Sequence, residues 1–197
     1  MNRILFLLLS MSSLLFTTGC CENHLKLRVY DLSCENLTDP LGIGSSNPRL
    51  SWKFETSADG ESLSAYQILA ASSPDLLTEN KADLWNSGKT ESPESILISW
   101  NGEELLSGSV CYWKVRIWDN SGRRSGWSET AHFTTGLLEN SEWKGDYIGI
   151  SDSSEFCVSP LLKRDFTIDK LSGRYYLHVN SLGYHEVWIN GARVGEY

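Results

Sequence analysis

Residue types that carry out chemistry are present in this 197-residue chain, but not at the spacings that assemble a site. Serine and histidine occur without the G-x-S-x-G turn that presents the nucleophile of many hydrolases. No glycine-rich stretch runs into the Lys-Ser/Thr pair of a phosphate-binding loop. Cysteine and histidine lack zinc-site spacing, and His178 and His185 could share a metal only if paired across neighbouring strands. The sequence therefore predicts no catalytic residue and no metal site.

Charge and composition narrow the class of partner. The chain has 25 acidic and 17 basic residues, a formal net charge of −8, and no basic run longer than Arg123–Arg124. Such a surface repels a phosphate backbone, so we expect no nucleic-acid partner. Hydrophobic residues make up 41% and aromatic residues 11% of the chain. These fractions are typical of a folded protein, and the aromatic content favours β-strands.

The amino terminus has the pattern of an export signal. A short positive region (Met1–Arg3) precedes an apolar stretch over 4–16, which is too short to span a bilayer comfortably. Gly19 then precedes Cys20, which resembles the lipoprotein box of bacteria. The resemblance implies a signal peptide over 1–19, lipidation of Cys20, and a short tether over 20–24 that holds the exported chain at the bacterial envelope, periplasmic or on the cell surface. Ordinary secretion is the alternative.

Four further cysteines would then lie in an oxidising compartment. They are Cys21, Cys34, Cys111 and Cys157, and they allow three pairings between which the sequence does not choose. Cys111 falls within an alternating strand pattern, where it is most simply a small buried hydrophobic residue.

Residues 25–136 have the pattern of an antiparallel β-sandwich. The best strand is predicted over 110–119, where the apolar face would hold Cys111, Trp113, Val115 and Ile117 and the opposite face Tyr112, Lys114, Arg116 and Trp118. Other strands are expected to begin near 27 and to cover 49–54, 65–71, 95–100 and 129–135, with one helical turn over 73–77.

Residues 137–197 predict the beginning of a second sandwich. Strands are expected over 174–179 and 184–189, and Asn190-Gly191 is typical of a type I′ turn that returns the chain along 192–194. Only about four strands are predicted here, whereas a jelly roll needs about eight. The predicted fold class is therefore all-β, a fibronectin type III-like sandwich followed by an incomplete jelly-roll sandwich.

Longer motifs carry a family resemblance. L-S-W (50–52), Y-W-K-V-R-I-W-D-N-S-G (112–122) and S-G-W-S-E (125–129) look like a fibronectin type III domain, with Trp52 as a core plug and Trp127 closing one end. In order, D-P-L-G-I-G-S-S-N-P-R-L-S-W (39–52) and S-L-G-Y-H-E-V-W-I-N-G-A-R-V-G (181–195) extend the match. Together these motifs resemble the N-terminal region of bacterial α-L-rhamnosidases of glycoside hydrolase family 78.

The resemblance implies a multidomain exported enzyme that removes terminal α-linked L-rhamnose by inversion. In this family the general acid and the base lie in a separate (α/α)6 barrel, so no catalytic residue is assigned to this chain. The implied role is a non-catalytic accessory portion, with the remainder of a rhamnosidase chain and rhamnose-containing glycans as partners. No cofactor is expected, although calcium is possible in the complete jelly-roll domain.

Sugar binding is the remaining candidate activity. Tyr184, Trp188 and Asn190 lie near the predicted hairpin tip and would offer an apolar platform with a polar group. Alternation of Tyr184, Glu186 and Trp188 fits packing against another sheet equally well. The alternative to the accessory role is a free-standing surface lipoprotein that binds glycan or protein through its β-domains.

Overall fold

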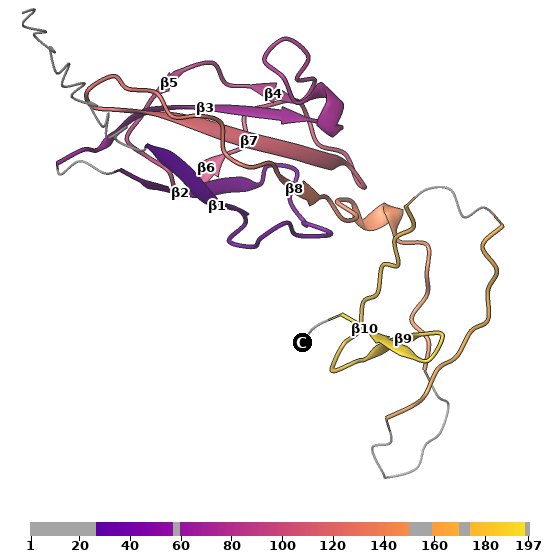
Figure 1. Cartoon of the computed structure of the whole chain (residues 1–197). Coiled ribbons are helices and arrows are strands. Elements are labelled where there is room, and N and C mark those ends of the chain that lie inside the picture. Colours follow the sequence, from indigo (N-terminus) through magenta and orange to yellow (C-terminus); the bar gives the residue numbers. More distant parts are fainter. Residues whose placement is uncertain (1–26, 57–59, 150–158, 170–173, 196–197) are drawn as a thin grey trace, which may run out of the picture.

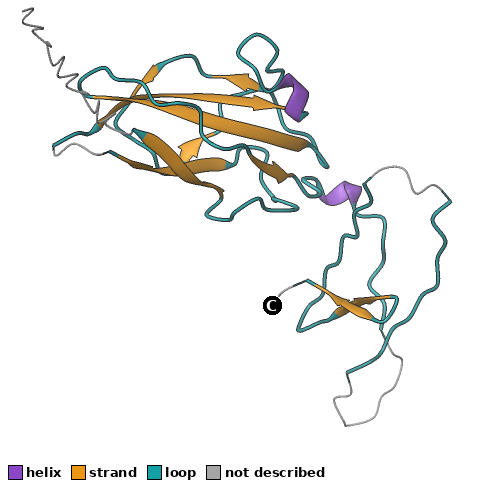
Figure 2. Ribbon diagram, in the orientation of Figure 1, coloured by secondary structure: helices purple, strands orange, loops and turns teal. Residues whose placement is uncertain are grey.

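The chain forms a β-sandwich followed by an extended segment that ends in a hairpin (Figures 1 and 2). The structure, a computed structural model, describes residues 27–56, 60–149, 159–169 and 174–195. Two short 3-10 turns, Pro74–Leu76 and Asn140–Glu142, are the helical elements within these ranges. No helix in the described part has the length and apolar character that crossing a bilayer requires. The predicted all-β fold class is confirmed.

Two antiparallel sheets make up the sandwich. The smaller sheet has the strand order β1-β2-β6, with β1 (Arg28–Cys34), β2 (Arg49–Glu55) and β6 (Ile98–Ser99). The larger sheet has the order β4-β3-β7-β8, and β5 also pairs with β3. Its strands are β3 (Leu63–Ala71), β4 (Trp85–Asn86), β5 (Thr90–Glu91), β7 (Val110–Asp119) and β8 (Ala131–Thr134). Figure 1 shows β3 and β7 as the long central pair of this sheet.

The inner face of β7 supplies the centre of the core. Its predicted apolar side chains are all at most 1% exposed, and they are Cys111, Trp113, Val115 and Ile117. Trp52 of β2 lies opposite, 2% exposed, with its ring 5.2 Å from the ring of Tyr66 in an edge-on arrangement. Burying each large side chain contributes about 1.5–3 kcal/mol, which makes this face the main source of stability. The predicted β7 face and the Trp52 plug are both confirmed.

The outer face of β7 is covered by stacked cations and rings. The Arg116 guanidinium lies 4.4 Å from the ring centroid of Trp127 and 5.4 Å from that of Trp118. Arg116 also donates to Gln67 Oε1 at 2.7 and 3.0 Å and pairs with Glu79 at 2.5 Å. The prediction that Trp127 closes one end of the sandwich is wrong. Its ring packs on the outer face of β7, against the Arg116 guanidinium and Lys114 Nζ, which lies 5.1 Å from the ring centroid. Both cations interact favourably with the face of the indole.

Short strands and loop segments depart from the sequence prediction. β4 and β5 were not predicted, because two-residue strands carry no periodicity. The strand expected over 95–100 contracts to β6, and the chain before β6 is held by single bonds such as Trp52 N–H to Ser95 O at 2.9 Å. The helical turn expected over 73–77 is present as a 3-10 turn.

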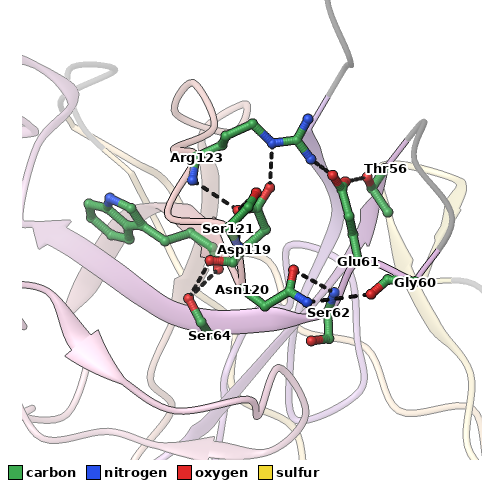
Figure 3. Close-up of polar contacts among 10 residues, drawn as sticks. Thr56, Gly60, Glu61, Ser62, Ser64, Asp119, Asn120, Ser121 and Arg123 are labelled. Carbon is green, nitrogen blue, oxygen red and sulfur yellow. Dashed lines mark hydrogen bonds and ion pairs between the residues drawn. The ribbon is translucent and has the colours of Figure 1, made fainter.

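A polar network closes the loop after β7 (Figure 3). The carboxylate of Asp119 is 1% exposed, and its Oδ1 accepts the backbone N–H groups of Ser121 and Arg123 at 2.9 Å each. The Nε of Arg123 donates to Asp119 Oδ2 at 2.8 Å. Arg123 also pairs with Glu61, which in turn accepts the hydroxyl of Thr56. The loop therefore satisfies a buried carboxylate entirely with its own donors and one arginine.

The chain leaves the sandwich through a backbone-bonded junction. Gly136 N–H donates to Ile43 O at 2.9 Å, and Gly108 N–H donates to Gly136 O at 3.2 Å. Both bonds hold the end of the last sandwich strand against loops on either side of it. The exit direction is thereby fixed at Gly136.

Glu142 fixes the next turn of the junction. Its Oε2 accepts the N–H groups of Leu138 at 3.1 Å and Glu139 at 2.9 Å, together with the hydroxyl of Ser107. The Ser107 hydroxyl oxygen also accepts the Leu138 N–H at 2.8 Å. The Ser107 hydrogen bond, followed by the Glu139 N–H, lowers the pKa of the Glu142 carboxyl. A loop of the sandwich and the following segment thus share one carboxylate.

The segment after the junction contains one hairpin among its described residues. β9 (Val187–Ile189) pairs with β10 (Ala192–Val194), with Trp188 opposite Arg193. Asn190 and Gly191 both have positive φ, 50° and 80°, which is the requirement of the predicted type I′ turn. The strand predicted over 174–179 is wrong, since those residues pair with no neighbouring strand in the described part and β character alone does not form a ladder.

Removing the Asp119 carboxylate should destabilise the sandwich. Asp119→Ala leaves two loop N–H groups and the Arg123 guanidinium without their buried acceptor, so we expect a loss of about 3 kcal/mol in the free energy of unfolding. Asp119→Asn, the matched control, keeps an acceptor for the N–H groups and should lose about half as much. Urea denaturation followed by tryptophan fluorescence measures both. A loss below ~0.5 kcal/mol for the alanine variant would contradict the role assigned to the network.

The Glu142 junction should respond to acid. Because the folded pKa of Glu142 lies below its ordinary value of 4.5, its stabilising contribution is fully present above pH 4.5. That contribution is lost as the pH falls through the lower folded pKa. In an NMR titration, the amide signals of Leu138 and Glu139 should shift with a midpoint below pH 4.5. The shift should vanish in Glu142→Gln and persist in Glu104→Gln. A midpoint at or above the ordinary value would show that the carboxylate does not hold the junction.

Candidate functional site

The hairpin brings the two predicted aromatic residues onto one face. Side chains two residues apart along an extended chain point to the same side, so Tyr184 and Trp188 are on the side that also holds Glu186. Tyr184 is 83% exposed and Trp188 is 56% exposed. Their ring surfaces therefore face solvent in the described structure, and the alternative of packing against a second sheet is not realised among the described residues.

Glu186 ties the two rings together. The Tyr184 hydroxyl donates to Glu186 Oε1 at 2.7 Å, and the Trp188 Nε1–H donates to Oε2 at 3.3 Å. Arg193, opposite Trp188 in the hairpin register, lies 3.5 Å from Oε1. The pKa of Glu186 is lowered, first by the Tyr184 hydrogen bond, then by Trp188 and by the charge of Arg193. One carboxylate thus orients two rings and a guanidinium.

Asn190 has a conformational role. It occupies the first positive-φ position of the turn, a position that asparagine tolerates better than most residues. Its presence is explained by the hairpin turn, and the residue is exposed.

Glu186 and Arg193 belong to this group of side chains but were not among the predicted site residues. The signal for Glu186 was present, because it lies midway between Tyr184 and Trp188 in the alternation. The signal for Arg193 required the register, since only a two-residue turn at Asn190-Gly191 places Arg193 opposite Trp188. Together the four side chains form an aromatic face, defined as Tyr184, Glu186, Trp188 and Arg193.

The aromatic face can bind but is not arranged for acid–base catalysis. Exposed rings offer stacking surface to the C–H groups of a sugar, and the carboxylate and guanidinium offer an acceptor and donors to its hydroxyls. A general acid for glycoside cleavage needs a raised carboxyl pKa, whereas that of Glu186 is lowered. The face therefore supports recognition of a neutral polar ligand.

A serine–histidine pair near the hairpin does not form a nucleophile. Ser181 Oγ lies 2.7 Å from His185 Nδ1, but the same hydroxyl donates to Gly183 O at 2.5 Å. The serine proton is therefore engaged by the backbone, and the oxygen accepts from the imidazole. His178 instead contacts Trp143, with ring centroids 6.3 Å apart. The two histidines do not share a site, and no group of three metal-ligating side chains occurs among the described residues.

The buried carboxylates of the sandwich are also unsuited to glycoside chemistry. Asp119 and Glu61 lie on either side of Arg123, which pairs with both (Figure 3). An inverting pair needs one protonated acid and one free base separated by a water molecule. Here a permanent cation fills the space between the carboxylates, so the arrangement is structural.

The cysteines that the structure describes are free and buried. Cys34 and Cys111 are 1% and 0% exposed in the sandwich core. Burial raises the pKa of the Cys34 thiol to about 12 and that of Cys111 well above its ordinary value. Neither thiol is thus a ready nucleophile. Cys20, Cys21 and Cys157 lie outside the described residues, so lipidation of Cys20 stays a prediction.

Comparison with known proteins places this sandwich in a family. Residues 29–139 match the family model described as Rha78A-like, N-terminal immunoglobulin domain. An α-L-rhamnosidase of Formosa agariphila is 33% identical over 223 aligned positions, which cover all of this chain and 23% of that enzyme. An α-L-rhamnosidase of Streptomyces avermitilis is 39% identical over 122 positions, covering 62% of this chain and 12% of the enzyme. The chain thus spans about a quarter or less of these relatives.

Solved structures agree with the family match. The Streptomyces avermitilis α-L-rhamnosidase complexed with L-rhamnose aligns with a TM-score of 0.57 and 40% identity, over 60% of this chain and 11% of that one. The α-L-rhamnosidase from Dictyoglumus thermophilum aligns with a TM-score of 0.57 and 38% identity, over 59% of this chain and 13% of that one. The sandwich fold and these matches agree. The chain belongs to the Rha78A-like N-terminal immunoglobulin domain family, the Ig-like portion of α-L-rhamnosidases.

Proposed function

We propose that the chain is the non-catalytic accessory portion of an exported α-L-rhamnosidase and that it braces the remainder of the enzyme. The Glu142 junction carries this proposal, because one carboxylate bonds a sandwich loop and the following segment together. A linker that served only as a tether would need no such bonds. Arg174 adds a second tie, since its guanidinium donates to the Tyr112 hydroxyl on the outer face of β7 at 2.7 Å.

The surface that would meet the rest of the enzyme follows the junction. No described residue after Gly136 is buried, and large apolar side chains there are open to solvent, including Leu161 at 93%, Leu182 at 93% and Phe166 at 68%. Large apolar side chains left open to solvent over a whole segment are typical of a surface that a partner covers. The relatives are several times longer than this chain, so their remaining domains are the natural occupants of that surface. The partner proposed here is accordingly the remainder of a rhamnosidase chain.

Catalysis would belong to that remainder. The carboxylates of Glu61, Asp119 and Glu186 are paired with arginine, and Glu186 also accepts from two rings. None of the three forms an acid–base pair. The activity proposed for the whole enzyme is the hydrolysis of terminal α-L-rhamnose from glycans, in line with the names of the relatives. Export and lipid anchoring at Cys20 would hold the enzyme at the bacterial envelope, where such glycans are met.

Fractionation combined with an activity assay tests the proposal. The chain and its Cys20→Ala variant are produced in a bacterial host, and membrane and soluble fractions are assayed with an aryl α-L-rhamnoside. We expect the unaltered chain in the membrane fraction, the variant outside it, and no rhamnose release from either. Release above a buffer blank would refute the non-catalytic role. Recovery of the variant with the membranes would refute lipid anchoring at Cys20.

Sugar recognition by the aromatic face is the proposed aid to substrate binding. The observation that favours it is the pre-orientation of two exposed rings by Glu186, which lowers the entropy lost on contact with a ligand.

Trp188→Ala tests the aromatic face. Removing the indole takes away most of the stacking surface, so L-rhamnose should perturb the backbone amides of 184–193 at least about fivefold less than in the unaltered chain. Trp143→Ala, which removes an exposed tryptophan outside the face, is the control and should leave those perturbations unchanged. Equal perturbation of the hairpin amides in both variants would exclude the aromatic face as a sugar site.

A further inference from the structure

The outer face of the smaller sheet contains a hollow that the hairpin and the junction do not use. Its volume is about 430 Å³, within the range of ~300–1,000 Å³ typical of small-molecule sites. The lining side chains that matter come from β1, β2 and the chain before β6: Tyr30, Asp31, Asn36, Ser51, Lys53 and Ile96. The hollow therefore lies on the sandwich itself, the part of the chain with the buried core.

Hydrogen bonds from two backbone N–H groups hold the wall of the hollow around Ile96 in place. Trp52 N–H donates to Ser95 O at 2.9 Å, and Leu97 N–H donates to Ser51 Oγ at 2.8 Å. These bonds fasten the residues on both sides of Ile96 to β2. The anchoring strand belongs to the core sandwich, so these bonds connect the wall of the hollow to a packed sheet.

A bulge in β1 places the charged group at the opposite wall. The register between β1 and β2 shifts between Tyr30 and Ser33, and Asp31 within the bulge has φ of 53°. A bulge of this kind turns a side chain out of the regular alternation. Asp31 Oδ2 consequently lies 2.7 Å from Lys53 Nζ across the strand pair. Asn36, which also lines the hollow, has φ of 64°. Aspartate and asparagine tolerate this left-handed conformation, which here turns both side chains toward the same hollow.

The chemistry of the lining selects a neutral, hydroxyl-rich ligand. Tyr30 is 39% exposed and Ile96 is 69% exposed, so the hollow offers an aromatic and an aliphatic surface. Asp31 and Lys53 cancel in charge while presenting acceptors and donors side by side, and Asn36 supplies both. An anionic ligand would be repelled by the Asp31 carboxylate. A purely apolar ligand would displace the water that hydrogen-bonds to the ion pair and would offer no hydrogen bonds in its place.

We propose that this hollow is a second carbohydrate site, which takes one pyranose ring with its C–H face on Tyr30 and its hydroxyls on Asp31, Lys53 and Asn36. Such a site would hold a glycan chain on the sandwich while the substrate end is presented elsewhere in the enzyme. The choice of L-rhamnose as the probe rests on the proposed function. The argument for a sugar site in the hollow comes from the lining residues and does not depend on that function.

A titration of the full chain with L-rhamnose, followed by backbone-amide NMR, tests the proposal. We expect millimolar saturation with perturbations at 30–36 and 51–54. In Tyr30→Ala the affinity at these amides should fall at least tenfold, because the ring that covers the sugar is lost. Tyr30→Phe keeps the ring and should bind within twofold of the unaltered chain. Asp31→Asn, which asparagine tolerates at positive φ, should also weaken binding because it leaves Lys53 without its partner. Thermal melts that match the unaltered chain confirm that each variant is folded.

Three outcomes would overturn the site. The first is the absence of saturable perturbation at 30–36 and 51–54, and the second is full retention of binding in Tyr30→Ala. The third is loss of the perturbations at the hollow in Trp188→Ala, which would make them an indirect effect of the aromatic face. Binding at the hollow and binding at the hairpin are measured at different amides, so either proposed site can be refuted without the other. Failure of the accessory role is read separately, from membrane fractionation and rhamnoside hydrolysis.

Discussion

Strand β7 cannot be removed from its place without exposing most of the core, because it pairs with β3 over nearly its whole length and with β8 at its start. Its inner side chains pack against Trp52 and Leu50 from the other sheet, and its outer side chains hold the stack of cations and rings around Arg116. The loop that follows β7 is closed by the Asp119 network, and the loop before it contains Ser107, which binds Glu142. The core, the outer face and the junction therefore all depend on the pairing of β7 with its neighbouring strands.

The two parts of the chain differ in the source of their order. In the sandwich, burial of apolar surface outweighs the conformational entropy of ordering the strands. After Gly136 none of the described residues is buried, and order there comes from hydrogen bonds at the junction, from the hairpin turn and from side-chain contacts such as Arg174–Tyr112 and Trp143–His178. A segment held in this way gains stability when its apolar side chains meet a partner surface. This difference in the source of order is the physical argument behind the proposed bracing role.

Both proposed sugar contacts use ion pairs and rings, but they are positioned differently. On the hairpin, Glu186 orients Tyr184 and Trp188 through hydrogen bonds between neighbours along the strand. On the sandwich, the bulge at Asp31 and the bonded wall at Ile96 bring together residues that are distant in the sequence. The first arrangement depends on local geometry, and the second depends on the packed sheet beneath it.

The sequence alone determined the features that rest on local chemistry. The alternation over 110–119 predicted which side chains of β7 are buried, and Asn190-Gly191 predicted the type I′ turn, because period and turn propensity are properties of neighbouring residues. Only the tertiary structure showed that Trp127 packs on the outer face of β7 and that Arg193 pairs with Glu186. It also showed that residues 174–179 have no partner strand in the described part and therefore do not form the expected strand. It alone showed the hollow between Tyr30 and Ile96 as well. The Arg193–Glu186 pair depends on the exact register of the hairpin. The other features depend on contacts between segments that are separated along the chain, and such contacts leave no periodic signal in the residues that make them.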